Sequence, residues 1–398
     1  MRTATPALAR AINDRLALDL FLTRGPLTAP QLRDLTGLSR PTVSDLIERL
    51  QGEGLIEVTG ERGEERRGPN ARVYGLVAAR AYVAGVDLRR NAVHATVADI
   101  TGQVLGSASI PLPGPASVPL PGPAPLSPPG PAPVSSPGSA SVFPPGSASV
   151  FPPDSASVSP PGSPPEVDLP GLLAAAVARA AQGRPLHHVV IGAPGVVHPH
   201  TGLSTIEGLP GWRPDLLDAV RRSLSGLLTD PAATRVAMEN EVNLAAIAEH
   251  RLGAGAGHDD FALLWLDDGV GAALVLDGRL RRGASGGAGE VGLIEVGGEP
   301  ICCLVQESVG AGLADAALAE CVVHGAFSLA AVVDPGLIVL GGATGRERGA
   351  GLAELVQGRL AELYPPPTQV RASTVEGNAI LEGAVLTALD RVRDEVFG

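Results

Sequence analysis

Residues 28–50 read TAPQLRDLTGLSRPTVSDLIERL, and this stretch decides the fold of the N-terminal part of the chain. Thr28 and Gln31 have the spacing of a capping box, which predicts the start of a helix. Gly37 permits a tight turn, and Ser39 is placed to cap a second helix. The stretch therefore predicts a helix-turn-helix.

Each of the two helices is expected to have one apolar face. Leu32 and Leu35 form the first face, and apolar residues recur at helical spacing in the second helix, at Val43, Leu46, Ile47 and Leu50. A short polar N-terminal end on a buried helix is what the major groove of DNA admits. We expect DNA contacts from Thr28, Ser39, Arg40, Thr42, Ser44 and Arg49. The alternative is an ordinary helical hairpin with a solvated polar face.

A β-hairpin is predicted directly after the second helix. Leu55–Val58 and Arg72–Leu76 are strand-like, and a polar loop with several arginines separates them. An arginine-tipped hairpin suits phosphate or minor-groove contact, which adds Arg66, Arg67 and Arg72 to the expected DNA contacts. Glutamates in the loop dilute its charge, so a solvated loop is the alternative. With a further helix in front, this order is that of a winged helix, and we expect an all-α/winged-helix domain over residues 1–76.

The charge of the chain is unevenly distributed. The 398 residues carry a formal net charge of −12, whereas residues 1–76 hold 11 Arg against 10 Asp and Glu. The acidic excess therefore lies outside the expected DNA-binding domain, residues 1–76. The three cysteines form no disulfide framework, and neither the N-terminus nor Leu172–Ala181 has the length of a signal peptide or a membrane span. We expect a cytoplasmic protein with no membrane partner.

Residues 77–398 are expected to form an α/β body. Three short strands, Tyr82–Asp87, Val93–Asp99 and Val104–Ile110, precede alternating helix and strand signals that end in an amphipathic helix, Asn378–Val396. Residues 111–165 interrupt this body and consist almost entirely of Pro, Gly, Ser, Ala and Val. This composition cannot bury enough surface to fold, so it predicts a disordered insertion. Binding of a proline-recognising partner is the alternative role of this segment.

Six short motifs of the body resemble those of the ROK family and follow the family's order. They are Gly85-Val-Asp87, Gly192-Ala-Pro-Gly195, Pro210-Gly-Trp212, Glu239-Asn-Glu-Val-Asn243, Gly289-Glu-Val-Gly292 and Pro335–Gly342. The ROK family comprises repressors and sugar kinases with an actin-like, two-lobed ATPase fold, and a winged helix in front marks its transcription factors. The resemblance implies this fold for residues 77–398. It also implies an effector pocket at Gly195, Asn240, Glu241 and Glu290, with capping and lobe packing as the alternative for Asn240 and Glu290.

The segments that bind phosphate in kinases of the ROK family differ in this chain. Residues 87–91, DLRRN, replace a glycine-rich turn, and residues 266–271, LDDGVG, place two carboxylates where a triphosphate would be repelled. The family's catalytic base is an Asp, and Glu241 occupies this degenerate base position. We therefore expect no catalytic residue and no kinase activity. A new metal site at Asp267 and Asp268 is the alternative for that turn.

The family's zinc ligands are largely missing from the sequence. Leu293 stands where the family has a His, and the cysteine loop has shrunk to the adjacent pair Cys302 and Cys303. We therefore expect neither a metal nor a cofactor. Because Leu293 cannot contact a sugar hydroxyl, the pocket has lost polar partners. A modified sugar, a less polar ligand or no ligand is then as well supported as a free hexose.

These expectations combine into a DNA-binding transcriptional regulator, a repressor whose body senses a sugar or sugar derivative. One winged helix reads one half-site, so we expect a homodimer or higher homo-oligomer on a pseudo-palindromic operator in double-stranded DNA. A ligand-independent regulator or interaction scaffold is the first alternative. A sugar kinase with an appended DNA-binding domain is the second, and the lost phosphate glycines argue against it.

Overall fold

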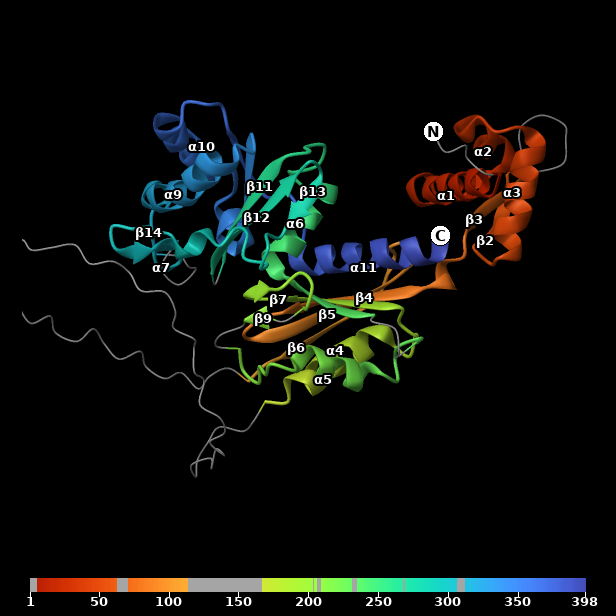
Figure 1. Cartoon of the computed structure of the whole chain (residues 1–398), viewed down its shortest axis with the longest axis horizontal. Coiled ribbons are helices and arrows are strands. Elements are labelled where there is room, and N and C mark those ends of the chain that lie inside the picture. Colours follow the sequence, from red (N-terminus) through yellow and green to blue (C-terminus); the bar gives the residue numbers. More distant parts are fainter. Residues whose placement is uncertain are drawn as a thin grey trace, which may run out of the picture.

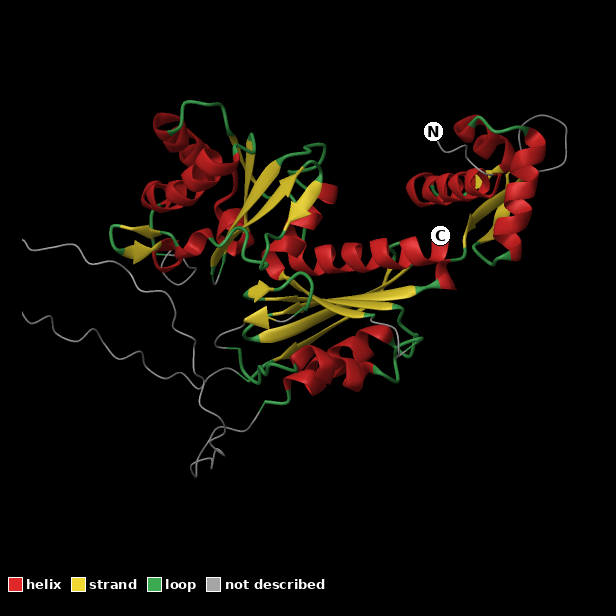
Figure 2. Ribbon diagram, viewed as in Figure 1, coloured by secondary structure: helices red, strands yellow, loops and turns green. Residues whose placement is uncertain are grey.

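The computed structural model describes residues 6–62, 71–113, 167–202, 204–205, 209–230, 235–267, 269–305 and 312–398. Within these ranges the chain forms a winged helix and a separate body of two α/β lobes (Figure 1, Figure 2). Residues 63–70, with Arg66 and Arg67, and residues 114–166, with most of the expected insertion, lie outside the described residues. Asp268 lies outside them as well.

The winged helix has the predicted order of elements. Its helices are α1 (Pro6–Arg24), α2 (Ala29–Thr36) and α3 (Arg40–Gly52), and its wing strands are β2 (Ile56–Arg62) and β3 (Ala71–Leu76). A short strand that the sequence did not predict, β1 (Leu27–Thr28), pairs with β3 and completes a three-stranded sheet. The prediction of three helices followed by a hairpin is confirmed.

The capping signals act locally as predicted. The Thr28 hydroxyl accepts a hydrogen bond from the Gln31 amide, and the Gln31 side chain accepts one from the Thr28 amide, which closes the capping box. The Ser39 hydroxyl caps α3 by accepting from the Thr42 amide. The predicted apolar face of α2 is only half correct, because Leu32 is buried whereas Leu35 is 47% exposed.

The first lobe is built on a mixed five-stranded sheet. In the order β10-β7-β4-β5-β6, β10 (Val236–Asn240), β7 (His188–Ala193) and β4 (Tyr82–Leu88) are parallel, and β5 (Ala92–Asp99) and β6 (Val104–Pro111) continue antiparallel. Helices α4 (Leu169–Ala181) and α5 (Leu216–Leu224) cover one face and share a core with the sheet. The short pair β8 (Val196–Val197) and β9 (Ser204–Thr205) follows β7.

The second lobe repeats this topology. Its sheet has the order β13-β12-β11-β16-β17, with β11 (Phe261–Leu266), β16 (Leu337–Gly341) and β17 (Gln369–Ala372) parallel and β12 (Val270–Leu276) and β13 (Arg279–Arg281) antiparallel. Helices α9 (Asp315–Val333) and α10 (Gly342–Leu363) cover one face. Between β13 and α9 lie η2 (Val291–Leu293), β14 (Glu295–Val296), β15 (Glu299–Pro300) and α7 (Ile301–Val305). The turns β4–β5 and β11–β12 are therefore equivalent positions in the two lobes.

Two helices join the lobes. Helices α6 (Glu241–Leu252) and α11 (Ala379–Phe397) lie against each other between the two sheets and share one core with both (Figure 1). Gly383 makes this contact possible, because a Cβ on it would meet the Leu244 carbonyl oxygen at 1.9 Å. The two-lobed, actin-like architecture that the resemblance implied is confirmed.

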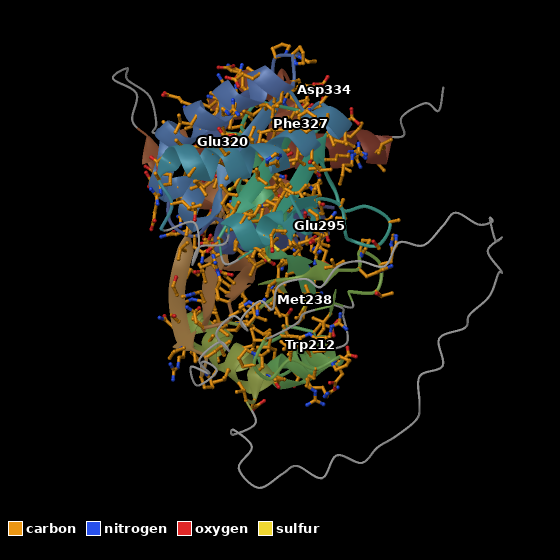
Figure 3. The ribbon with its side chains drawn as sticks, turned by 90° about the vertical axis from the view of Figure 1, so that its left-hand side faces the viewer. Trp212, Met238, Glu295, Glu320, Phe327 and Asp334 are labelled. Atoms are coloured by element: carbon orange, nitrogen blue, oxygen red, sulfur yellow. The ribbon has the colours of Figure 1, made fainter. Side chains whose placement is uncertain are left out.

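Helix α9 is the one described helix long and apolar enough to cross a membrane. Its apolar side chains, however, pack into the core of the second lobe, with Leu318, Val322, Ala326 and Leu329 buried. Glu320, Phe327 and Asp334 lie along the outer side of this lobe (Figure 3). The apolar composition of α9 is thus explained by a core helix.

The far end of α11 touches the winged helix. Arg15 of α1 forms an ion pair with Asp394, with 3.1 Å between Nη2 and Oδ1, and its guanidinium lies 5.7 Å from the centre of the Phe397 ring. In Figure 1 the C-terminus accordingly lies beside α1. Helix α11 therefore extends from the space between the lobes to the winged helix.

Candidate functional site

The first candidate site is the polar face of α3. Arg40, the first residue of the helix, and Ser44 are exposed, and Thr42 is half-buried with its hydroxyl 2.8 Å from that of Ser39. The opposite face is held in the core by Val43, Leu46, Ile47 and Leu50. A helix presented in this way has its N-terminal end available to a DNA groove. Arg72 of the wing is exposed as well.

Two of the expected DNA contacts, Thr28 and Arg49, have partners within the winged helix. Thr28 is only 6% exposed, and its hydroxyl is used within the capping box, so it supports α2 from inside. Arg49 donates to Asp14 of α1 through a 2.6 Å Nη2–Oδ1 bond, and this carboxylate raises the pKa of Arg49. Arg49 therefore fastens α3 to α1.

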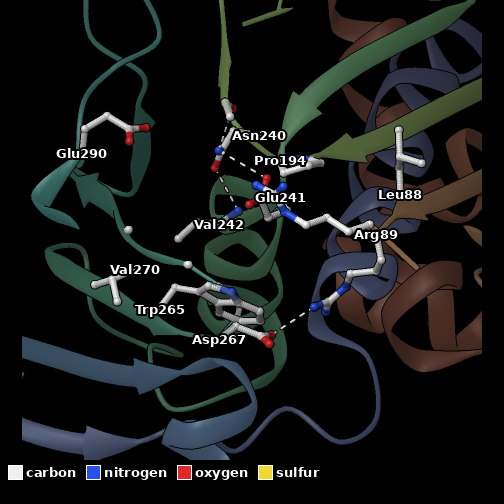
Figure 4. Close-up of a pocket in the computed structure, with 14 residues that line it drawn as sticks. Leu88, Arg89, Pro194, Asn240, Glu241, Val242, Trp265, Asp267, Val270 and Glu290 are labelled. Carbon is white, nitrogen blue, oxygen red and sulfur yellow. Dashed lines mark hydrogen bonds and ion pairs between the residues drawn. The ribbon is translucent and has the colours of Figure 1, made fainter. Parts of the chain in front are cut away.

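The second candidate site is a cavity of about 200 Å³ between the lobes (Figure 4). All four expected effector residues, Gly195, Asn240, Glu241 and Glu290, line it. They come from the turn after β7, the junction of β10 with α6, and the loop before η2. The cavity also contains Trp265 and Arg89, which the sequence did not assign to an effector site.

Asn240 is fully used in holding the local structure. Its side-chain oxygen accepts from the amides of Val242 and Asn243 at 2.8 and 3.0 Å, which caps α6. Its side-chain nitrogen donates to the Gly195 carbonyl at 3.0 Å. The alternative of a capping role is therefore correct for Asn240, and Glu241 and Glu290 are the carboxyl groups left to meet a ligand.

Both carboxyl groups have altered acidity. Burial raises the pKa of Glu241 to about 8, and the nearby charges of Asp87 and Glu290 act in the same direction. Burial also raises the pKa of Glu290. At neutral pH Glu241 is therefore mostly protonated, with about a tenth of it ionised at pH 7. A protonated carboxyl can donate one hydrogen bond and accept others, as a ligand hydroxyl can.

Replacing Glu241 with Gln is expected to stabilise the protein at alkaline pH. A carboxyl whose pKa rises from 4.5 to about 8 on folding makes stability fall as pH increases through that window. Glutamine does not ionise, so the variant should gain about 1–3 kcal/mol of unfolding free energy at pH 9 and little at pH 5, after allowance for solvent screening. Denaturant unfolding at both pH values measures this gain, with the exposed Glu354→Gln as control. Equal gains at both pH values would contradict the assignment.

Arg89 lines the cavity and joins the two equivalent turns. Its Nε donates to Asp87 at 2.9 Å. Its Nη1 donates to Asp267 at 3.0 Å (Figure 4). Burial alone would lower the pKa of Arg89, but Asp87 and Asp267 raise it above its usual value. The guanidinium is therefore a fixed cation placed between the two turns that the resemblance assigns to phosphate.

Asn378 also belongs to this group, which sequence reasoning missed. Its side-chain nitrogen donates to Asp87 at 2.7 Å, and its oxygen caps α11 by accepting from the Leu381 amide at 3.0 Å. The sequence placed Asn378 only at the start of the closing helix, and its partner lies 291 residues away. Asn378 connects the cavity to α11.

The two glycines at the junction of β16 with α10 have a structural explanation. Gly342 has a φ of 81°, and a Cβ on it would lie 2.2 Å from the Leu266 carbonyl oxygen. Gly341 would meet the Leu263 side chain at 2.9 Å. Close packing of the strand-to-helix turn against β11 accounts for both residues.

The cysteine loop forms α7 and contains a close thiol pair. Cys302 and Cys303 have their sulfur atoms 3.9 Å apart, and burial raises the pKa of Cys302. Leu293, at the family's His position, is 71% exposed. In the part of the chain that the structure describes, no three His, Cys, Asp or Glu side chains are placed to hold a metal ion.

Comparison with known families identifies two regions of the chain. The ROK family matches residues 158–322, and the MarR family matches residues 16–67. The first region begins before α4 and ends within α9 of the two-lobed body, and the second begins within α1 and ends between β2 and β3 of the winged helix.

Individual relatives match the chain over different lengths. The β-glucoside kinase of Listeria monocytogenes is 34% identical over 125 residues, which cover 30% of this chain and 39% of that kinase. The xylose repressor of Lactiplantibacillus pentosus is 46% identical over 57 residues, or 14% of this chain and 15% of the repressor. A ROK family transcriptional regulator, a homologue of the E. coli MLC protein, superposes with a TM-score of 0.64 at 15% identity and covers 98% of this chain and 99% of its own.

Proposed function

Because the chain belongs to the ROK family and carries a MarR-type helix-turn-helix at its N-terminus, we propose that it is a cytoplasmic, DNA-binding transcriptional repressor. The proposed effector is a sugar or sugar derivative that binds between the lobes. The observation that carries this proposal is α3, which is anchored by one apolar face and presents Arg40, Thr42 and Ser44 on the other. Arg40 and Arg72 are the cations proposed to meet DNA.

The effector role is supported by the make-up of the cavity. Glu241 and Glu290 offer carboxyl groups to hydroxyls, and Trp265 provides an aromatic wall. The cavity, with its volume of about 200 Å³, accommodates a small polar molecule more readily than a nucleotide. The Arg89 bridge leaves the carboxylates of Asp87 and Asp267 already paired.

A continuous set of contacts links this cavity to the winged helix. Arg89 binds Asp87, Asp87 binds Asn378 at the start of α11, and Asp394 near the end of α11 binds Arg15 of α1. A ligand that rearranges the cavity can thereby change how α11 meets the winged helix. Such coupling requires that the ligand prefer one arrangement over the other.

The test is operator binding by the full chain. Fragments enriched from genomic DNA should contain a pseudo-palindrome and should be shifted by a homodimer, because one winged helix reads one half-site. A panel of sugars and sugar derivatives is then tested for release of that DNA. Absence of any enriched sequence contradicts the proposed function, and release by none of the ligands favours the ligand-independent regulator.

Glu290→Gln is expected to desensitise the repressor without affecting DNA binding itself. Loss of a charged hydrogen-bond partner should raise the ligand concentration that releases DNA by about tenfold. The operator affinity without ligand should stay unchanged, because Glu290 lies in the cavity and not on α3. Titration of the ligand into the protein–operator complex measures this shift, with Glu354→Gln as control. An unchanged response would show that the effector binds elsewhere.

A further inference from the structure

A second cavity, of about 520 Å³, lies beside the edge strand β10. Consecutive residues of this strand face the two cavities, because Glu239 lines this one and Asn240 lines the first. Its walls include Met238, Leu217 and Val197, and Met238 is visible on this side of the first lobe in Figure 3. Nothing in the proposed repressor mechanism uses this second cavity.

Three guanidinium groups from separate elements line the second cavity. Arg221 comes from α5, Arg282 from the loop after β13, and Arg391 from α11. The loop is close to the first lobe, since a Cβ on Gly286 would meet the Val197 carbonyl oxygen at 2.1 Å. The cavity is therefore built from both lobes and from the helix that joins them.

The arginines keep unused hydrogen-bonding capacity. Glu239 accepts from Arg282 Nε at 2.6 Å, and its other oxygen accepts from Asn243 and from the Asn240 amide. In the described chain, the Arg282 guanidinium is bonded only through Nε, and the Arg391 guanidinium has no hydrogen bond or ion pair. Burial, together with the charge of Arg282, lowers the pKa of Arg391 despite the presence of Glu239.

Arg221 and His198 add donors to the same cavity. Arg221 donates to Asp218 and to the Val236 carbonyl, and the Asp218 side chain is 64% exposed, so that solvent weakens this pairing. His198 Nδ1 accepts hydrogen bonds from the amides of His200 and Thr201. In the neutral ring the proton therefore sits on Nε2, and Nε2 can act as a donor. Donors and positive charge thus dominate, in a protein whose formal net charge is −12.

We propose that this second cavity binds the phosphate group of a small phosphorylated metabolite. Guanidinium groups match phosphate oxygens in paired hydrogen bonds, and a phosphate monoester is close to a dianion at neutral pH. The volume exceeds what a phosphate alone needs and falls within the range of small-molecule sites. The apolar walls at Met238 and Leu217 would cover the remainder of the molecule.

Such a ligand would act on contacts that the sugar cavity also uses. A phosphate that draws Arg282 away from Glu239 changes the loop that continues to Glu290. A phosphate held by Arg391 acts on α11 one turn before Glu395, which binds His188 and Arg235 of the first lobe. The second cavity would therefore be a separate control point on the same joining helix.

The test is direct binding to the full chain in the absence of DNA, which makes it independent of the proposed repressor function. Inorganic phosphate and glucose 6-phosphate are titrated and followed by calorimetry and by ³¹P resonance. We expect one site per chain and tighter binding of glucose 6-phosphate, because the cavity also encloses its sugar. Arg391→Ala and Arg221→Ala should each weaken binding about tenfold or more, and Arg391→Lys should weaken it less.

Three control variants separate this site from other cations. Arg222→Ala changes the neighbour of Arg221 outside the cavity, Arg40→Ala changes the DNA reader, and Glu290→Gln changes the sugar cavity; all three should leave phosphate binding unchanged. The Arg391 side chain makes no hydrogen bond in the described chain, so its replacement should not unfold the protein, which a melting curve verifies. Absence of binding by both probes at millimolar concentration, or native affinity in Arg391→Ala and Arg221→Ala, overturns the proposal.

Discussion

Arg40→Ala and Thr42→Ala are each expected to weaken specific operator binding by about 1–3 kcal/mol, which corresponds to roughly 10- to 100-fold in affinity. Arg40 stands exposed at the first position of α3, and Thr42 lies two residues further along the same end. Side chains at this end of a recognition helix reach base edges in the major groove. Mobility shifts on the enriched operator, with random duplex as competitor, measure the loss.

Two further variants, one in α3 and one in the wing, make this test selective. Gln51 is exposed at the far end of the same helix and carries no charge, so Gln51→Ala should leave operator affinity unchanged. Arg72→Ala in the wing should instead weaken specific and non-specific DNA about equally and reduce the salt dependence, as expected of a phosphate contact. Native affinity in both Arg40→Ala and Thr42→Ala would remove α3 as the recognition helix.

The parts of the fold that local signals determine were predictable from the sequence. Local signals of this kind marked the capping residues Thr28 and Ser39. They also marked the strands β4, β5 and β6 and the closing helix α11. Leu35 was misjudged because α2 has only eight residues, and the packing around it, more than its apolar pattern, decides which positions are covered. β1 was missed because two residues carry no periodic signal.

Contacts between distant residues were not predictable. Arg49 looked like an outward-facing cation, and only the folded arrangement brings Asp14, 35 positions earlier, to its guanidinium. Arg89 and Asp267 were each placed at a phosphate position, yet their pairing across 178 residues depends on the way in which the two lobes face each other. The three arginines of the second cavity come from three elements and form no motif in the sequence. Gly195, Asn240, Glu241 and Glu290 were found because a family resemblance supplied this long-range information.

The repeated topology of the lobes explains why the Arg89 bridge is significant for catalysis. The β4–β5 and β11–β12 turns occupy equivalent positions and meet across the cavity. Phosphoryl transfer depends on positioning the phosphates and neutralising their charge. Here the guanidinium joins the two turns, and the two carboxylates bound to it would repel phosphate groups placed beside them.

Purified protein is therefore expected to show no sugar-dependent ADP release with magnesium–ATP and a panel of hexoses. Without an aligned γ-phosphate, the carboxyl at the degenerate base position has no reaction to assist, and a pKa of about 8 leaves Glu241 mostly protonated at pH 7. A coupled assay for ADP measures this, with an added commercial hexokinase as the positive control. Hexose-dependent ADP release that Glu241→Ala abolishes and Glu354→Ala retains would contradict the loss of kinase activity. It would also mean that the Arg89 bridge opens when substrates bind, because nucleotide phosphates cannot occupy the same space as the guanidinium.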